Sequence, residues 1–552
     1  MLFNNTLMIL IKEKFRIYIS KSFFKIKSAI WLIPLLTLFS AIILNFEFLL
    51  NHDTGWLFLA TKKWLSGAAL YSEIIEVNPP LIFIIFSPIV YLTELLEISS
   101  VIIIIKLYLI LLICIPSFFF LKIILNLPTF EKQKALITTI VILLLFILPM
   151  YDFGQRDHIA FVFLLPYLTY RYIIHTQILK TNLLESVIIG VLAGVGLCLK
   201  PYLLFLPLFT ELFFLYKNKN LKRMFSIEFL SMLGFCLTFL IYILYFERAY
   251  IELMIPLGKA TYWTYGIPLS HFGLPEKFFI WIILFFIAFK IKGKRNQDIL
   301  FYGHSLTLGA LLSFLLQSHF NYQILPFNIV LSIMFLLTTM FYIFQFKGSI
   351  HIQNKFKFLI LTLWISIFLF DINTIINRNN KLTELVNGAP PSLKTLKLDH
   401  LETTKRVINQ HFFNKNIYVL STNVWPSSFI SNYTHANWSS GFPAMWPLPA
   451  IDFAERYPHL ITKNKLSNIE SIKLFVTSTI AREITKSKPE AIIIDVSEKL
   501  SYSHDDFNYL NFFSRHDNLS QILKNYELSD LKVSFFKSKK YVVFIRKRDI
   551  SI

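Results

Sequence analysis

The sequence predicts a polytopic α-helical membrane protein with a C-terminal soluble α/β domain. Of its 552 residues, 55% are hydrophobic and 16% are charged, whereas an ordinary soluble domain has roughly a quarter charged residues. The hydrophobic residues gather in long runs that end near residue 372, and residues 373–552 mix charged residues with Asn and Ser. The composition therefore excludes an ordinary soluble enzyme.

The membrane module is expected over residues 30–372. Residues 1–29 are basic, and the apolar run 30–46 has no small-residue cleavage site at its end, which predicts an uncleaved signal anchor. Other runs are long enough, or nearly so, to cross about 30 Å of hydrocarbon. They are 80–96, 101–121, 134–150, 159–174, 183–199, 201–216, 227–246, 276–290, 298–316, 325–346 and 357–372.

The basic residues predict the orientation. Of the 30 Lys and Arg in residues 1–372, 21 lie in six segments, and the positive-inside rule places such segments in the cytoplasm. They are 1–29, 122–134, 175–182, 217–223, 290–297 and 347–357. Assigning the apolar runs as membrane crossings between these cytoplasmic segments predicts about 11 spans, with 80–96 as a re-entrant or interfacial helix. The formal charge of +20 then reflects a membrane protein, and no nucleic-acid partner is expected.

This assignment places the C-terminal domain, residues 373–552, on the outer, periplasmic side. Three short β-type segments separated by helical stretches predict an α/β domain of ordinary size. A cluster of Trp425, Trp438 and Trp446 has two interpretations, a carbohydrate-stacking surface or a surface that docks onto the membrane module. The predicted strands are Asn416–Thr422, Ala491–Ser497 and Tyr541–Lys547.

The first outer loop contains a candidate catalytic acid. Asp53 follows the first span directly, and an apolar helix to Leu65 and the sequence Asn78-Pro79-Pro80 come after it. A helix in the membrane interface followed by re-entry at the prolines fits this pattern. An alternative is that Asp53 caps the helix and that Glu76 is simply solvated.

The second outer loop has four consecutive polar residues, Gln155, Arg156, Asp157 and His158, between apolar runs. Such groups are costly at a membrane boundary unless they bind a ligand or one another. The planar Arg156 guanidinium suits a phosphate, and Asp157 and His158 suit hydroxyl orientation or a proton relay. The alternative is an Arg156–Asp157 pair that only anchors a turn.

Two further outer segments carry candidate binding residues. Lys200 lies on the outer side, against the positive-inside tendency, and either binds a phosphate or extends its amine to the membrane surface. In the turn 317–323, Tyr322 and Gln323 would contact a sugar by stacking and hydrogen bonding, with His319 beside them. The alternative for this turn is an interfacial aromatic belt.

The order of these motifs resembles that of bacterial GT-C glycosyltransferases, in particular the family that includes protein mannosyltransferases and lipid A aminoarabinose transferases. The resemblance covers about residues 30–346, and the C-terminal tail resembles the periplasmic domain of many members. It implies an enzyme of the bacterial inner membrane that moves a sugar from a polyprenyl-phosphate carrier to a glycolipid, glycan or protein acceptor at the periplasmic face. The motifs are Asp53, Ser66-Gly67, Leu70-Tyr71, Asn78-Pro79-Pro80, Gly154-Gln155-Arg156-Asp157-His158 and Lys200-Pro201.

The resemblance also implies roles for these residues. Asp53 would be the catalytic carboxylate, as general base or as ligand of a divalent metal, and Asp157 the second acid. Arg156 and Lys200 would hold the leaving phosphate, with the rest of the Gln155–His158 motif beside the substrate. If a metal is used, a carboxylate pair without histidine ligands favours Mg²⁺ or Mn²⁺; metal dependence stays open.

This chain departs from the family in the first loop. Glu76 and Asn78 stand where relatives have Glu-Lys before the two prolines, so the substrate need not be that of the aminoarabinose enzymes. Two alternatives remain, a flippase or transporter for a lipid-linked substrate and a polymer transferase similar to O-antigen ligases. A transporter predicts ionisable groups in broken helices at mid-membrane, whereas this sequence places them at one face.

Overall fold

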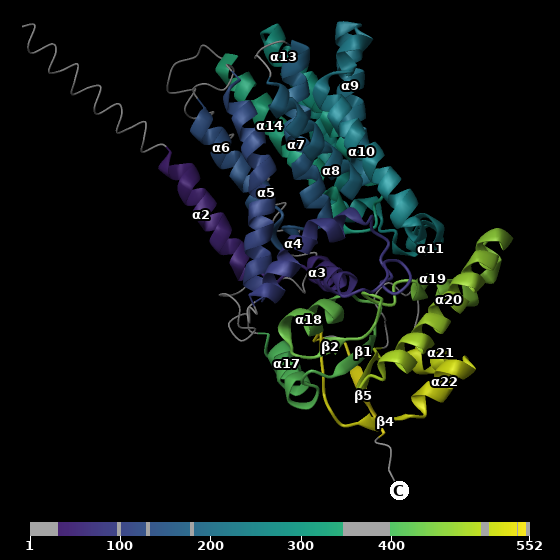
Figure 1. Cartoon of the computed structure of the whole chain (residues 1–552). Helices are drawn as coiled ribbons and strands as arrows, with labels where there is room; N and C mark the ends of the chain where they lie inside the picture. The colour runs from purple at the N-terminus through teal and green to yellow at the C-terminus, as the bar shows by residue number, and fades with distance from the viewer. Residues whose placement is uncertain are drawn as a thin grey trace, which may run out of the picture.

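The computed structural model describes residues 31–96, 101–127, 133–176, 182–345, 398–497, 507–537 and 539–547. Residues 31–345 form a helical bundle, and residues 398–547 form an α/β domain at one end of it (Figure 1). The predicted N-terminal basic segment, 1–29, and the last predicted span, 357–372, lie outside the described residues.

The helices of the bundle follow the apolar runs of the sequence. Their bounds are α2 Leu32–Glu47, α3 His52–Leu65, α4 Leu81–Leu95, α5 Val101–Leu125, α6 Lys134–Ile142, α7 Arg156–Thr176, α8 Leu183–Leu199, α9 Phe205–Asn218, α10 Ile227–Phe246, α11 Ile255–Thr261, α12 Leu274–Lys290, α13 Lys294–Leu315 and α14 Leu325–Gln345.

Five described helical segments are long and apolar enough to cross a membrane. Helices α2 and α3 pass the same test as a pair, but they are bent by 73° relative to each other. The predicted re-entrant segment 80–96 forms the short apolar helix α4, and α8 is also short. The protein is therefore a membrane protein by helix length and composition, and the number of eleven crossings stays a prediction. The five segments are Val101–Leu125, Arg156–Thr176, Ile227–Phe246, Lys294–Leu315 and Asn321–Tyr342.

A buried lysine terminates α2. The last carbonyl groups of a helix have no hydrogen-bond donor inside the helix. Lys106 of α5 is the donor for several of these carbonyl groups at the end of α2. Its Nζ donates to the carbonyl oxygens of Asn45 at 3.0 Å and Phe46 at 3.1 Å, and also to that of Phe48. The positive charge also suits the negative end of the helix dipole.

The next helix starts from a side-chain cap. Asn51 is the N-cap of α3, and its Oδ1 accepts from the backbone N–H groups of Asp53 at 3.0 Å and Thr54 at 3.4 Å. Capping is therefore done by Asn51, which leaves the Asp53 carboxylate in the first turn available for other contacts.

Helix α8 packs closely against two neighbouring helices because it has glycines on the two faces that contact them. A Cβ at Gly190 would lie 2.3 Å from the carbonyl oxygen of Glu228 on α10, and one at Gly196 would lie 2.6 Å from that of Ala160 on α7. Small residues of this kind let membrane helices approach closely. The glycines thereby join α7, α8 and α10.

The end of α7 far from the C-terminal domain contains a buried ionic network. Arg171 is fully buried, and its Nε and Nη2 donate to the two carboxylate oxygens of Glu211 at 2.6 and 2.5 Å. Its Nη1 pairs with Glu228 and Ser226, and His175 Nε2 lies 2.9 Å from Nη2. All three guanidinium nitrogens are therefore paired within the protein.

The C-terminal domain has a five-stranded sheet in the order β2-β1-β3-β5-β4. Strand β1 is parallel to β2 and β3, with Ile417 opposite Ala491, and β5 is antiparallel to β3 and β4. The three predicted strands are confirmed as β1, β3 and β5. The bounds are α17 Asp399–His411, β1 Asn416–Leu420, α18 Trp425–Tyr433, β2 Asn437–Trp438, α19 Leu448–Arg456, α20 Lys463–Ser487, β3 Ala491–Asp495, α21 Tyr509–Ser514, α22 Asp517–Leu523, β4 Tyr526–Ser529 and β5 Tyr541–Arg546.

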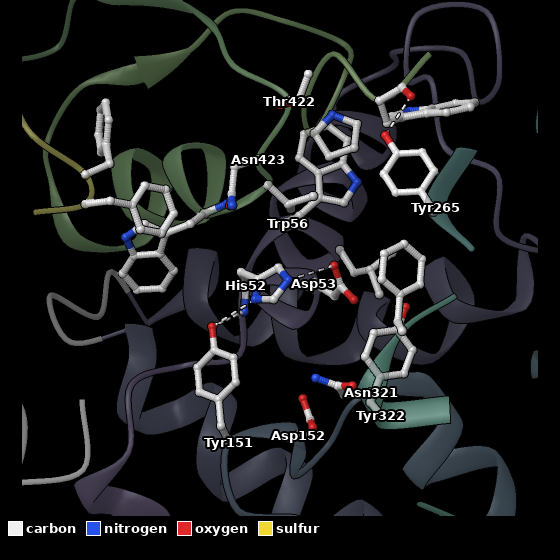
Figure 2. Close-up of a pocket in the computed structure, with 18 of the residues that line it drawn as sticks. His52, Asp53, Trp56, Tyr151, Asp152, Tyr265, Asn321, Tyr322, Thr422 and Asn423 are labelled. Carbon is white, nitrogen blue, oxygen red and sulfur yellow. Dashed lines mark hydrogen bonds and ion pairs between the residues drawn. The ribbon is translucent and has the colours of Figure 1, made fainter. Parts of the chain in front are cut away.

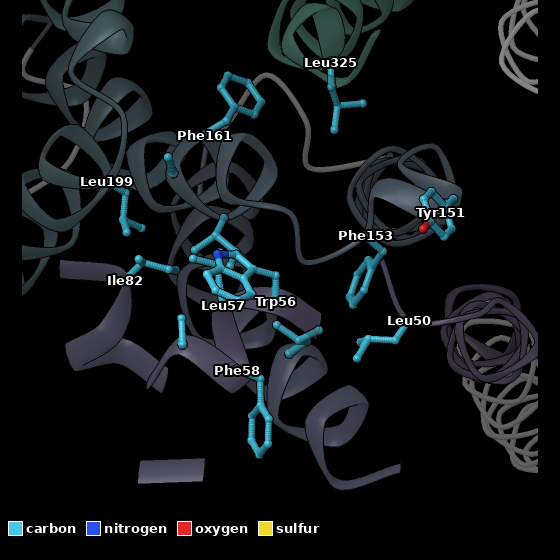
Figure 3. Packing of buried hydrophobic residues seen from close by; sticks show 14 of the residues in the cluster. Leu50, Trp56, Leu57, Phe58, Ile82, Tyr151, Phe153, Phe161, Leu199 and Leu325 are labelled. Atoms are coloured by element: carbon cyan, nitrogen blue, oxygen red, sulfur yellow. The ribbon is translucent and has the colours of Figure 1, made fainter. Parts of the chain in front are cut away.

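Helix α3 lies between the bundle and the C-terminal domain (Figure 1). Trp56 and Leu57 are buried in a continuous core with Phe161 of α7 and Leu199 of α8 (Figure 3). On its other side α3 contacts α18, where Gly55 leaves no room for a Cβ, which would lie 2.0 Å from Ser428 Oγ.

A glycine in the loop after β2 completes the docking of the two parts. The Gly441 carbonyl accepts from the backbone N–H of Ile75 at 2.9 Å, and its own N–H donates to Glu483 Oε1 at 2.9 Å. A Cβ at Gly441 would lie 2.0 Å from the backbone carbonyl oxygen of Glu73. Only glycine allows the two backbones to approach this closely.

We therefore expect Gly441→Ala to destabilise the docked arrangement by about 1–3 kcal/mol, the usual cost of overpacking. Thermal unfolding and limited trypsin digestion of the purified protein in detergent measure this effect. Gly234→Ala is the matched control, because a Cβ at Gly234 meets nothing within 4 Å. Equal unfolding temperatures and digestion rates for the two variants would contradict the role of Gly441.

Candidate active site

A cavity of about 580 Å³ lies between the bundle and the C-terminal domain, a size typical of small-molecule sites. Both parts of the chain line it. The membrane module contributes residues from segments 52–57, 76–78, 151–156, 262–267 and 320–322, and the C-terminal domain contributes residues from 398–401, 422–425, 443–446 and 535–537.

Asp53 lines this cavity from the first turn of α3. Gln155 Nε2 donates to its Oδ2 at 3.1 Å, and His52 Nε2 lies 3.6 Å from its Oδ1 (Figure 2). The His52 ring is fixed in turn by the Tyr151 hydroxyl, 2.9 Å from Nδ1. The carboxylate is thus oriented from two sides and still borders the cavity.

Asp152 is a second carboxyl group in the same cavity (Figure 2). Its Oδ1 accepts from Asn51 Nδ2 at 3.2 Å. Burial, together with the negative charges of Asp53 and Asp157, raises the pKa of Asp152 to about 7. Asn51 therefore connects the two cavity acids, because it caps the helix that carries Asp53.

Arg156 also lines the cavity, and it is buried, with 7% exposure. Its Nε and Nη1 atoms have no hydrogen-bond partner. Four Lys and Arg side chains are buried in the part of the chain that the structure describes, and the other three, Lys106, Arg171 and Lys200, have protein partners. A buried cation with unpaired donors is costly unless a ligand pairs with it.

Asp157 and Lys200 form an ion pair with each other, with Lys200 Nζ 3.0 Å from Asp157 Oδ2. Lys200 also donates to Gln317 Oε1 at 3.0 Å. Both residues are buried, and neither is among the residues that line the cavity. Consecutive helical residues point about 100° apart, so the start of α7 directs Arg156 to the cavity and Asp157 away from it.

The other two residues of that motif support the loop. Gln155 Oε1 accepts from the Asp157 backbone N–H at 2.8 Å. His158 Nδ1 accepts from the Gly154 backbone N–H at 3.1 Å, and the His158 side chain is buried. Gln155 thus reaches the site through Asp53, and His158 lies outside the residues that line the cavity.

Glu76 and Asn78 line the cavity beside Trp56. Trp56 Nε1 donates to Glu76 Oε2 at 2.7 Å, and the Asn78 backbone N–H donates to Oε1 at 3.1 Å. Burial raises the pKa of the Glu76 carboxyl above its usual range. Glu76 is therefore a hydrogen-bonded acceptor that fixes the indole ring in the wall of the cavity.

The turn 317–323 divides into lining and supporting residues. Tyr322 lines the cavity and stacks on Phe320, with ring centroids 5.6 Å apart. Gln323 Oε1 instead closes the turn by accepting from the backbone N–H groups of His319 at 2.9 Å and Phe320. Asn321 lines the cavity, and its buried Oδ1 has no hydrogen-bond partner. His319 and Gln323 are not among the lining residues.

The predicted metal ligands have protein partners instead. Asp53 accepts from Gln155, and Asp157 pairs with Lys200. In the described ranges no three His, Cys, Asp or Glu side chains are grouped to hold a metal ion. The residues present do not fit the predicted Asp53–Asp157 metal pair.

No protein-family model matches this chain, and no curated protein sequence matches it either. The function therefore rests on the residues and their geometry.

The site also contains residues that sequence reasoning did not select. Asp152 belongs to the same outer loop as the Gln155–His158 motif but lies three residues before it. Thr422 and Asn423 follow strand β1 after one residue, Ser421, and the carboxyl end of a strand is the usual position of ligand-binding residues in a parallel sheet. Tyr262 stacks on Trp446, with ring centroids 5.4 Å apart, a contact between distant segments that the sequence does not reveal.

The raised pKa of Asp152 predicts a pH-dependent stability. The folded protein binds this proton up to about pH 7, whereas the unfolded chain releases it near the ordinary value of 3.8. The folded state therefore loses stability between these values as the pH rises, by at most about 1.4 kcal/mol per pH unit.

Asp152→Asn stays neutral, so the difference in unfolding temperature, variant minus wild type, should rise from pH 5 to pH 7 and level off by pH 8. Thermal unfolding in detergent at each pH measures this, with Asp517→Asn, on the exposed start of α22, as the control. A difference that is constant across this range would refute the assignment.

The Asp157–Lys200 pair predicts strong coupling. Asp157→Asn or Lys200→Met should each lower the free energy of unfolding by about 3–5 kcal/mol, because each leaves a buried charge unpaired. The double variant should cost clearly less than the sum of the two, measured by thermal unfolding. Lys122→Met, which breaks the half-exposed pair with Glu185, should cost under about 1 kcal/mol. Additive costs at 157 and 200 would show that the two side chains do not interact.

Proposed function

We propose that this protein is an integral membrane glycosyltransferase that moves a sugar from a polyprenyl-phosphate carrier to a glycolipid, glycan or protein acceptor. The reaction takes place in the cavity that contains Asp53 and Arg156. The enzyme lies in the bacterial inner membrane with about eleven crossings and a periplasmic C-terminal domain. Nucleotide sugars are absent outside the cytoplasm, so a site on that side needs a lipid-borne donor.

The contrast between two buried arginines of α7 carries the proposal. Arg171 has every nitrogen paired with protein groups, whereas Arg156 has two buried nitrogens without a partner. Arg156 lines a cavity of substrate size and Arg171 does not. A guanidinium presents donors in the planar fork that a phosphate accepts, which supports a phosphate as the ligand of Arg156.

The reaction divides between two sides of the cavity. The acceptor hydroxyl attacks the anomeric carbon of the sugar, and the bond between this carbon and the carrier phosphate oxygen breaks. Asp53 takes the proton of the attacking hydroxyl, and Arg156 stabilises the negative charge that grows on the departing phosphate. The products are a glycosidic bond and the free polyprenyl phosphate.

The neighbouring carboxyl groups support these roles. Gln155 contacts one oxygen of Asp53 and His52 the other, and together they orient a carboxylate that lines the cavity. Asp152 takes the place of Asp157 as the second acid of the site, because it borders the cavity and Asp157 does not. Glu76, with its raised pKa, adds less negative charge near an anionic donor than an ordinary carboxylate would.

Mass spectrometry of envelope glycolipids and glycans from a deletion strain tests the proposal. Wild-type protein should restore one sugar that the deletion strain lacks. Asp53→Asn should lower its rate of addition by about 10²–10⁴-fold, the usual effect of losing a general base. Arg156→Gln should leave no detectable product, and Asp517→Asn serves as the exposed control. Full restoration by Asp53→Asn, at equal protein levels in the membrane, would rule out the catalytic assignment.

A further inference from the structure

The sheet of the C-terminal domain has a topological switch point that faces the cavity. From β1 the chain passes to β2 on one side, and later returns to β3 on the other side of β1. In open parallel sheets, ligands bind at such a point, outside the carboxyl ends of the strands. Thr422 and Asn423, which follow the carboxyl end of β1, line the cavity (Figure 2).

Aromatic rings with fixed positions flank these two polar residues. Trp446 stacks nearly parallel to Tyr262, at 5.4 Å and 10°, and its carbonyl accepts from the Tyr265 hydroxyl at 2.7 Å. Asn423 Oδ1 accepts from the backbone N–H of Trp425 at 2.9 Å, and the Trp425 ring contacts Phe429 of the same helix, α18, with ring centroids 6.0 Å apart. The wall is therefore organised before any ligand binds.

Hydrogen bonds also fix the position of this wall relative to Asp53. The Tyr433 hydroxyl, from the end of α18, accepts from the backbone N–H of Leu50 at 3.0 Å. Asn432 Nδ2 donates to the carbonyl of Gly55 at 3.3 Å. These contacts lie on either side of Asp53 in the sequence, so the C-terminal wall and the candidate base are parts of one fixed site.

The chemistry of the wall suits a saccharide. Pyranose rings offer C–H groups to aromatic faces and hydroxyl groups to amides and hydroxyls, and the wall has indole and phenyl rings together with Thr422 and Asn423. A lipid chain would not use the polar residues. An extended peptide would pair with a strand edge, but the edge-strand residues Asn437 and Trp438 are not among those that line the cavity.

We infer that the wall formed by residues 422–425 and Trp446 is the acceptor subsite and that the acceptor is a saccharide, so the enzyme forms a sugar-to-sugar linkage. This inference rests on the proposed transferase function. Asn423 would hold a hydroxyl group of the acceptor ring, which stacks on the indoles and presents another hydroxyl to Asp53.

The test compares variants in the deletion strain and determines the linkage of the added sugar. The strain receives wild-type protein, Asp53→Asn, Asn423→Ala, Trp446→Phe or Asn437→Ala, and the initial rate of sugar addition after induction is measured by mass spectrometry. Asn437 is the matched control, because it is exposed on the same domain. Thermal unfolding of each purified variant checks that the fold is retained.

The expected result is a linkage to a hydroxyl group of a sugar. Asn423→Ala should lower the rate by about tenfold, the value of one lost hydrogen bond, and Asn437→Ala should match wild type. Trp446→Phe, which keeps a ring, should reduce the rate less than Asn423→Ala.

Two results would overturn the inference and leave the transferase function standing. One is a sugar attached to a serine or threonine of a protein. The other is wild-type rates in both Asn423→Ala and Trp446→Phe, while Asp53→Asn is inactive. If the deletion changes no glycoconjugate, the proposed function itself fails, and the acceptor subsite fails with it.

Discussion

The position of Asp53 depends on a lysine inside the bundle. Lys106 binds the carbonyl groups at the end of α2, and Asn51 caps α3 a few residues later. These contacts stabilise the 73° bend between the two helices, because each satisfies backbone groups that a continuous helix would have paired internally. Without the bend, α3 would continue along the axis of α2, and Asp53 would not meet Gln155 in the loop before α7. The geometry around Asp53 thus depends on backbone hydrogen bonding.

Buried charge has two different uses in this protein. Along α7, Arg171 and Asp157 are compensated by protein partners, and such pairs mainly restrict which arrangements of the helices are allowed. Arg156 differs, since it lines the cavity and its buried Nε and Nη1 have no hydrogen-bond partner among the residues that the structure describes. Burial alone would not separate these roles. The two arginines of α7 differ in their hydrogen-bond partners, and this difference favours Arg156 over Arg171 as the residue that binds a ligand.

The sequence predicted the apolar helices, the C-terminal α/β domain and its three main strands, because hydropathy and periodicity are local signals. It also selected Asp53, Arg156, Glu76, Asn78 and Tyr322, all of which line the cavity. It could not distinguish Arg156 from Asp157 and Lys200, since the direction of a side chain depends on where a helix begins. The contribution of Thr422 and Asn423 was hidden, because it arises from docking between segments more than 350 residues apart.

Helix α7 is anchored near both of its ends. The Asp157–Lys200 pair and the Arg171 network lie about 21 Å apart along its axis at 1.5 Å per residue. A shift of α7 along its axis by a single residue would break both sets of contacts, so we expect the position of this helix to be fixed. In the proposed reaction a long-tailed donor must enter and leave. Because α7 is fixed, we expect the opening at the edge of the cavity, where the contacts of segment 262–267 with the C-terminal domain include the Tyr265 hydrogen bond and two aromatic contacts.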